Sequence, residues 1–227
     1  MTRGILIAGN ESSLYNAASA EALKRVTSFA YALIPNRFPL PEGRVVSVQK
    51  TEPPEGAIPL AWNPANSISA RTLVLAAENR LTKINDAILI CSPPAAFKTA
   101  EALLPEEIEI TVNDHIKGWF FLVRELAQYF RRVGSGTLSL VVPENRDSWN
   151  KNAPSDLLGS SASAAFRSLS QGIIDSSLNE AYQVMGFTGS DAGQEDEFAS
   201  WFFKIADEAS AKYSGRWHNY SKRGFFR

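Results

Sequence analysis

The chain has few of the residues that build disulfides or metal sites. It contains one cysteine and two histidines among 227 residues, which excludes internal disulfide bonds and a cysteine-rich metal site. Basic and acidic residues nearly cancel, at 23 against 24, so we expect neither nucleic acid nor a membrane as a partner. No apolar run approaches the roughly 20 residues of a membrane helix, and the first apolar run is too short for a signal peptide. A cytoplasmic location is the default expectation.

Hydrophobic residues make up 44% of the chain, enough to bury a substantial core. Short β-branched runs alternate with longer amphipathic segments, which is typical of strand–helix units around a parallel sheet. The pattern predicts an α/β fold with a doubly wound parallel sheet, a Rossmann-like three-layer sandwich, in a single domain over residues 1–227. We expect strands at 5–8, 44–49, 57–62, 87–91, 137–142 and 216–220, and helices at 14–33, 67–84 (N-capped by Ser67), 113–132, 155–181 and 198–209.

One stretch late in the chain, residues 160–169, reads Ser-Ser-Ala-Ser-Ala-Ala-Phe-Arg-Ser-Leu. Five further pieces accompany it in order: Ile-Leu-Ile-Ala-Gly at 5–9, Asp-Ala-Ile-Leu at 86–89, His-Ile-Lys-Gly-Trp-Phe at 115–120, Gly-Ser-Gly-Thr-Leu-Ser-Leu-Val at 134–141, and Asp-Glu-Ala-Ser with Tyr-Ser-Gly-Arg-Trp at 207–217. Together they resemble the short-chain dehydrogenase/reductase family across nearly the whole chain. The resemblance implies the Rossmann-like fold, and NAD or NADP as cofactor if that site is retained.

The catalytic helix of that family carries a Tyr and a Lys four residues apart. Both then project from one helical face, and the Lys lowers the pKa of the phenol. In the register that the resemblance sets, Gly159 stands at the Tyr position and Ser163 at the Lys position. None of the six tyrosines of the chain is followed by a lysine at the fourth position, so the dyad is absent in every register. The family's catalytic serine falls near Val142 and Pro143, which have no hydroxyl.

The family's phosphate-binding turn reads Thr-Gly, three residues, Gly-x-Gly. Only Gly9 is retained here, with Ser13 and Tyr15 at the other two glycine positions. Such glycines let the backbone approach a pyrophosphate, and we expect the Tyr15 side chain to obstruct that approach. Ser12 and Ser13 can cap the following helix or bind a small anion.

Three other positions of the family's cofactor site also differ. Asn63 stands where an acidic residue caps the adenine, and Ser92 lies in the segment that lines the cofactor. Lys50 directly follows the predicted strand at 44–49, where the family's ribose is selected, and could meet a phosphate. Asn63 and Ser92, together with Gly9, Ser12 and Ser13, form a remnant of a cofactor site. We expect that no cofactor binds there.

Cys91, His115 and Asn113 are the remaining candidates for chemistry. Cys91 and His115 would lie near the carboxyl ends of strands and could act as nucleophile and base. The alternative is a buried strand cysteine and a histidine near the surface. His115, or Asn113 with a two-residue shift, corresponds to the family's active-site Asn. The acidic run at 106–109 predicts a solvated face.

Two apolar helices need partners, which predicts a homo-oligomer formed through the helices at 113–132 and 155–181. At least one residue of the Trp-Phe-Phe triplet at 119–121 should point outward, because successive residues turn about 100° around a helix.

We expect a degenerate short-chain dehydrogenase-like protein, a pseudoenzyme without oxidoreductase activity that serves as a binding or scaffold subunit for a small molecule. One alternative is an NAD(P)-dependent oxidoreductase with a rebuilt site that uses His115 or Asn113. The other is a non-redox enzyme that uses Cys91.

Overall fold

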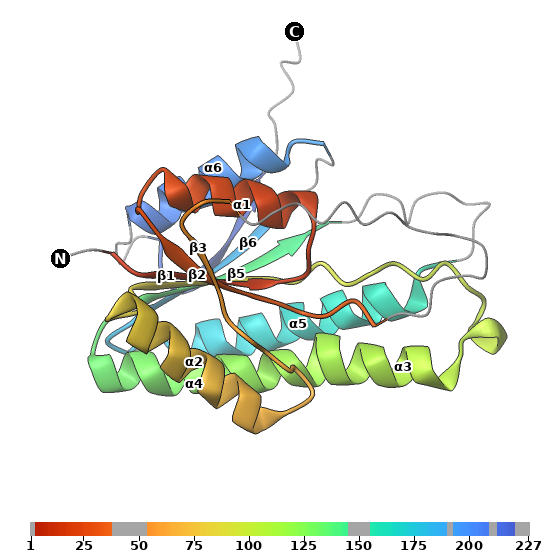
Figure 1. Cartoon of the computed structure of the whole chain (residues 1–227). Helices are drawn as coiled ribbons and strands as arrows, with labels where there is room; N and C mark the ends of the chain where they lie inside the picture. Colours follow the sequence, from red (N-terminus) through yellow and green to blue (C-terminus); the bar gives the residue numbers. More distant parts are fainter. Residues whose placement is uncertain (1–2, 38–53, 145–154, 190–192, 209–212, 221–227) are drawn as a thin grey trace, which may run out of the picture.

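The computed structural model describes residues 3–37, 54–144, 155–189, 193–208 and 213–220. Within these ranges, seven strands form one parallel sheet in the order β3-β2-β1-β4-β5-β6-β7 (Figure 1). The strands are β1 (Ile5–Gly9), β2 (Phe29–Leu33), β3 (Ala57–Pro59), β4 (Asp86–Ile90), β5 (Thr137–Pro143), β6 (Gln183–Gly189) and β7 (Arg216–Tyr220). The strand order reverses between β1 and β4. In such sheets ligands bind near this point, outside the carboxyl ends of the strands.

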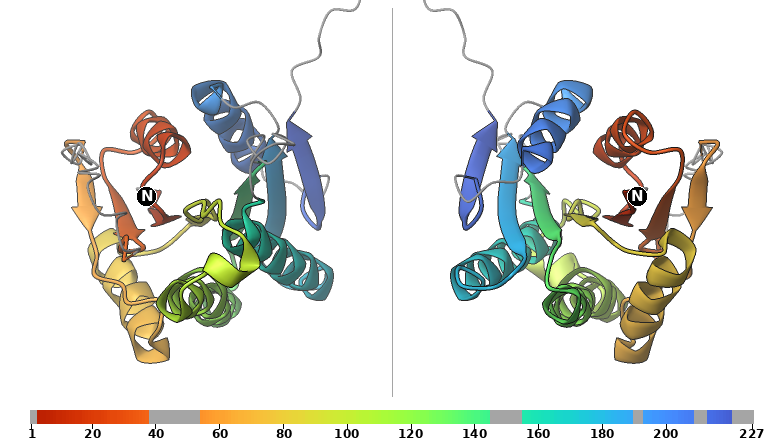
Figure 2. Two further views of the ribbon diagram at one scale, coloured as in Figure 1. Left: turned by 90° about the vertical axis from the view of Figure 1, so that its right-hand side faces the viewer. Right: turned by 90° about the vertical axis from the view of Figure 1, so that its left-hand side faces the viewer.

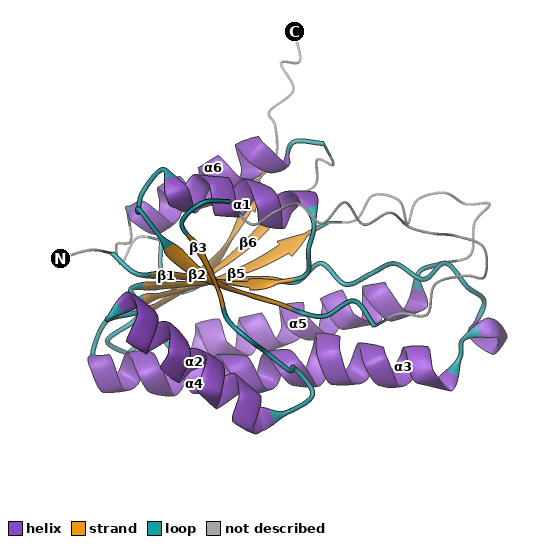
Figure 3. Cartoon of the chain, in the orientation of Figure 1, coloured by secondary structure: helices purple, strands orange, loops and turns teal. Residues whose placement is uncertain are grey.

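Helices cover both faces of the sheet, which confirms the three-layer sandwich (Figures 2 and 3). One face carries α1 (Ser13–Leu23) and α6 (Glu195–Asp207); the other carries α2 (Ser67–Leu81), α3 (Pro105–Val112), α4 (Gly118–Val133) and α5 (Leu157–Ser176). Side chains of β1 alternate between two cores, since Ile5 and Ile7 join the core that contains α1 and α6, whereas Leu6 and Ala8 join the other. None of the helices in the described ranges is long and apolar enough to cross a membrane.

The helix predicted at 14–33 is wrong in its second half. α1 ends at Leu23, and β2 follows at Phe29–Leu33, paired in parallel with β1 on one side and β3 on the other. Aromatic residues favour strands, and this pairing satisfies backbone groups on both sides of β2, which outweighs a local helical pattern. The strand predicted at 44–49 lies outside the described residues. The weak strand predicted at 57–62 is confirmed as β3, although it is shorter.

The sequence prediction missed a strand, β6, which lies between β5 and β7. The helix predicted at 155–181 ends at Ser176, and the chain then enters the sheet at Gln183. Glycine is depleted in strands, so the glycines of β6 weaken its sequence signal. Packing explains one of them, because a Cβ on Gly186 would lie 2.5 Å from the ring of Trp217 on β7.

The helix predicted at 113–132 begins earlier than expected. α3, a π-helix at Asn113–Lys117 and α4 follow one another directly. The prediction of a solvated acidic face is wrong for Glu107, which is 3% exposed. Its carboxylate accepts hydrogen bonds from Lys98 Nζ (2.7 Å) and from the backbone N–H of Leu104 (3.0 Å). Glu107 therefore helps to hold the start of α3.

The N-cap of α2 also differs from the prediction by one residue. Ser67 is the first helical residue, and Asn66 is the cap, because its Oδ1 accepts the backbone N–H of Ile68 at 2.8 Å.

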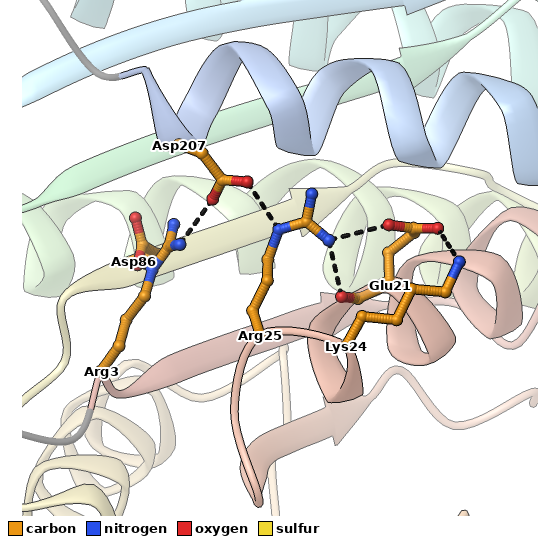
Figure 4. A network of polar contacts seen from close by, with 6 residues as sticks. All are labelled: Arg3, Glu21, Lys24, Arg25, Asp86 and Asp207. Carbon is orange, nitrogen blue, oxygen red and sulfur yellow. Dashed lines mark hydrogen bonds and ion pairs between the residues drawn. The ribbon is translucent and has the colours of Figure 1, made fainter.

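A group of charged side chains, here called the base network, joins the amino ends of β1 and β4 to the carboxyl ends of α1 and α6 (Figure 4). Its members are Arg3, Glu21, Lys24, Arg25, Asp86 and Asp207. Arg3 bridges Asp86 (2.6 Å) and Asp207, and Arg25 bridges Asp207 (2.7 Å) and Glu21 (2.8 Å). Burial raises the pKa of Glu21, but hydrogen bonds from Lys24 and Arg25 outweigh it and hold the pKa below its ordinary value. The network lies at the end of the sheet opposite the carboxyl ends of the strands, where it ties two helices to the sheet.

Candidate functional site

The main cavity, here called the crevice, lies at the carboxyl ends of β4, β5 and β6 and has a volume of about 610 Å³. Its remaining walls come from the beginning of α1, α5 and α6 and from the end of β7. This is the edge of the sheet at which doubly wound folds bind ligands, and the volume suits a small molecule.

The α5 wall of the crevice contains the two positions at which the resemblance places a catalytic dyad. Gly159 and Ser163 both line it. Asp156, the N-cap of α5, is 6% exposed, and its Oδ1 accepts the backbone N–H groups of Gly159 (2.9 Å) and Ala96 (3.0 Å). A Cβ on Gly159 would lie 2.2 Å from Asp156 Oδ2, so any larger side chain at 159 requires Asp156 to move.

The first turn of α1 is held by residues from two elements. Ser12 is the N-cap, as predicted, and its Oγ accepts the backbone N–H of Tyr15 at 3.2 Å. Ser13 Oγ donates to Glu195 Oε1 at 3.1 Å, and the same oxygen accepts the backbone N–H of Gly193 at 3.3 Å. α1 has no acidic residue in its own first turn. Glu195 of α6 therefore places a carboxylate at a helix N-terminus, a position that favours negative charge.

Gly9 ends β1, and a Cβ there would lie 2.7 Å from the carbonyl oxygen of Ile90 on β4. Strand packing alone thus explains why this glycine is needed, without reference to a cofactor.

Tyr15 does not obstruct the crevice, contrary to the sequence-based expectation. Leu14 lines the crevice, whereas Tyr15 lines a second cavity of about 280 Å³ between α1 and β2. The Tyr15 ring meets that of Tyr31 edge to face, with centroids 6.4 Å apart, and burial raises the pKa of the Tyr15 phenol. Consecutive side chains of a helix point in different directions, so Leu14 faces the crevice and Tyr15 faces the second cavity.

The three candidates for chemistry are not brought together around the crevice, whose described lining includes Cys91 but neither His115 nor Asn113. Cys91 is 1% exposed, and burial raises the pKa of its thiol, which disfavours the nucleophilic thiolate. His115 is buried within the π-helix, so the prediction of a histidine near the surface is wrong, and burial lowers its pKa to about 4. Asn113 Oδ1 accepts a hydrogen bond from Lys117 Nζ at 2.6 Å.

The remaining predicted cofactor positions lie on two sides of the switch point. Ser92 lines the crevice. Asn63 Oδ1 accepts hydrogen bonds from Arg37 Nη2 (3.3 Å) and from the backbone N–H of Ala65 (3.2 Å). β2 ends at Leu33, and Arg37 follows it by four residues. Lys50, which the sequence placed at the ribose position, lies outside the described residues.

Arg37 also approaches a buried carboxylate, with 3.6 Å between its Nε and Asp114 Oδ2. Asp114 is 1% exposed, and burial raises its pKa although Arg37 and Lys117 act in the opposite direction. Four residues of interest were not singled out from the sequence: Arg37, Glu144, Asp156 and Glu195. Of these, Asp156 had a signal, since an Asp directly before an apolar helical pattern is a typical N-cap.

Within the described ranges, no group of three or more histidine, cysteine or acidic side chains is placed to hold a metal ion.

No protein-family model matches the sequence, and no curated protein matches it. The structure, in contrast, is similar to solved structures of dehydrogenases and reductases. A 3-ketoacyl-(acyl-carrier-protein) reductase from Brucella melitensis complexed with NADH has a TM-score of 0.74 at 12% identity, over 96% of each chain. A short chain dehydrogenase from Mycobacterium smegmatis has a TM-score of 0.73 at 11% identity, over 98% of this chain and 93% of the other. The NADH-dependent reductase A1-R′ complexed with NAD has a TM-score of 0.70 at 11% identity, over 96% and 95%. The chain therefore has the fold of the short-chain dehydrogenases and reductases.

Proposed function

We propose that this protein uses the short-chain dehydrogenase/reductase fold without the oxidoreductase reaction, as a binding or scaffold subunit with a small-molecule crevice. The observation that carries the proposal is the α5 wall. Gly159 and Ser163 line it where an acid and its activating cation would be needed, and Asp156 Oδ2 fills the space next to Gly159. Proton transfer to a carbonyl requires a group whose pKa can be brought near the working pH, and neither position supplies one.

The first turn of α1 does not fit a dinucleotide. The Glu195 carboxylate, bound to Ser13, stands at the helix N-terminus where the pyrophosphate of such a cofactor approaches. Two unit charges of the same sign 4 Å apart repel by about 1 kcal/mol in water and about 4 kcal/mol at an effective dielectric constant of 20. A pyrophosphate would have to displace this carboxylate, so we propose that NAD and NADP do not bind.

A second candidate is an NAD(P)-dependent oxidoreductase with a rebuilt site. It is favoured by Arg37, which follows β2 at the place where a guanidinium can meet the 2′-phosphate of NADP. Similar solved structures also contain NADH or NAD. Against this candidate, Arg37 already interacts with Asn63 and Asp114.

Dinucleotide binding separates the two candidates. NADH and NADPH are titrated into the purified full chain while the melting temperature is followed, because a ligand that binds only the folded state raises it by mass action. We expect no shift for either dinucleotide. A saturable rise in the micromolar range would favour the oxidoreductase.

We also propose that the protein is a homo-oligomer assembled through the α4 and α5 side of the sheet. Of the triplet at 119–121, Trp119 is fully buried and Phe120 is 51% exposed, in line with the expectation that one of them points outward. Exposed apolar residues also occur at intervals of four along α3 and its N-cap: Leu104, Ile108 and Val112. An exposed apolar stripe of this kind marks an interaction surface.

Light scattering tests the oligomer. Phe120→Lys should reduce the molar mass of a native oligomer, whereas Ile68→Lys, at a 72% exposed position on α2, serves as the control and should not. A native monomer would contradict the proposal.

A further inference from the structure

The charged side chains in the described lining of the crevice are predominantly negative. Among the described lining residues, three are acidic, Glu144, Asp156 and Glu195, and one is basic, Arg167, which gives a net formal charge of −2. The guanidinium of Arg167 lies over the ring of Trp217, 5.1 Å from its centroid, and is exposed. A cavity lined by one sign of charge attracts ligands of the other sign. The described lining of the crevice therefore favours a cation over an anion.

Asp156 offers one carboxylate oxygen to a hydrogen-bond donor in the crevice. Its side chain is more than nine-tenths buried, and both backbone N–H groups that it accepts bind Oδ1. No described residue donates to Oδ2, which lies beside Gly159, where the lack of a side chain leaves it open to the crevice. A ligand N–H in the crevice has this carboxylate oxygen as an acceptor.

The other two carboxylates are also only partly satisfied. Glu144 Oε1 accepts a hydrogen bond from Thr188 Oγ1 (3.2 Å), and Glu195 Oε1 accepts from Ser13 and Gly193. No described residue donates to the second oxygen of either side chain. Each of the three carboxylates thus has one oxygen that accepts no hydrogen bond from the described part of the chain.

Among the described residues, no three acidic, histidine or cysteine side chains are placed to hold one metal ion. The three carboxylates are distributed around a space of about 610 Å³ that also includes the aromatic rings of Phe198 and Tyr220. Aromatic rings pack against methylene groups and attract ammonium groups. An organic cation with several ammonium groups on an aliphatic chain matches both features.

We propose that the crevice binds a protonated aliphatic di- or polyamine, with one ammonium group donating to Asp156 Oδ2 and others near Glu144 and Glu195. This inference rests on the proposed function, because it assigns a ligand class to the crevice that the oxidoreductase would use for its cofactor.

Calorimetric titration of spermidine into the full-length protein tests the proposal. Asp156→Asn retains an oxygen acceptor for the two N–H groups but removes the charge and the second acceptor, so spermidine should bind about tenfold or more weakly. Glu195→Gln should also weaken binding, and it decides the test if Asp156→Asn does not fold. Glu106→Gln changes the net charge by the same amount at an exposed position of α3 and should bind like the wild type. Tetramethylammonium, a cation without N–H groups, should bind much more weakly than spermidine.

Spermidine binding that is absent, or equal in the wild type, Asp156→Asn and Glu195→Gln, would overturn the inference, as would tetramethylammonium binding as tightly as spermidine. NADH is titrated in parallel. If NADH does not bind and spermidine fails, only the ligand class is wrong. If NADH binds saturably, the proposed function itself is wrong.

Discussion

Asp156 allows a quantitative test of the local structure around the crevice. Replacing it with Ala removes the N-cap of α5, which typically costs about 1 kcal/mol of the free energy of unfolding. It also leaves the backbone N–H of Ala96 without its acceptor, which costs about 1–2 kcal/mol for a partly buried donor. We expect Asp156→Ala to lower the stability by about 2–3 kcal/mol. Each kcal/mol shifts the melting temperature of a chain of this size by about 2–4 °C, so the expected decrease is about 4–12 °C.

Asp156→Asn is the matched control, because its amide oxygen can accept both N–H groups and Asn is as good an N-cap as Asp. It removes the buried charge as well, so it separates the hydrogen bonds from the cost of burying a carboxylate. We expect its melting temperature to stay within about 4 °C of the wild type, in line with a change below about 1 kcal/mol. Scanning calorimetry or circular dichroism measures both variants. An Asp156→Ala protein as stable as the wild type, or an Asp156→Asn protein as unstable as Asp156→Ala, would refute the argument.

Three further predictions follow from particular contacts. Gly186→Ala should destabilise the protein by about 1–3 kcal/mol, because the added Cβ meets the Trp217 ring. Gly172→Ala, at a position of α5 with open space around it, should stabilise the protein by about 0.5–1 kcal/mol. Urea denaturation measures the free energy of unfolding of both variants. Cys91 should react slowly with iodoacetamide at neutral pH and fast only after unfolding, because burial raises the pKa of its thiol, and mass spectrometry follows the adduct; fast reaction of the native protein would favour a catalytic thiolate. The pKa of Glu21 is held below its ordinary value of 4.5, so the Glu21 carboxylate stabilises the folded state above pH 4.5, and this contribution is lost as the pH falls through the lower pKa of the folded state. Glu21→Gln should therefore make the free energy of unfolding less dependent on pH in this acid range. An acid unfolding transition that is unchanged in Glu21→Gln would contradict the prediction.

The sequence predicted the fold class well because the strongest signals are local. β1, β4 and β5 are apolar runs bounded by turn residues, and each lies within a residue or two of its prediction. The failures have one physical cause, namely that the sheet decides structure where the local pattern is ambiguous. In the sequence pattern, the residues of β2 continue the helical pattern of α1, and only their pairing with β1 and β3 makes them a strand. β6 contains two glycines and becomes a strand only between β5 and β7.

The crevice could be predicted only in part. The positions of Gly159 and Ser163 follow from the resemblance, and the structure places both in the crevice wall. The carboxylate of Glu195 could not be foreseen, because it reaches Ser13 from 182 residues away along the chain. Arg37 was missed for another reason, since its position relative to the sheet depends on where β2 ends, and the prediction placed that strand elsewhere.

The central proposal is that this protein has the fold of the short-chain dehydrogenases and reductases but does not carry out hydride transfer. Its most direct test is to mix the pure protein with NADPH or NADH and a panel of aldehydes and ketones, and to record the absorbance of the reduced nicotinamide. We predict no decrease above the rate without protein. Sustained oxidation that depends on both the carbonyl and the enzyme concentration would contradict the account.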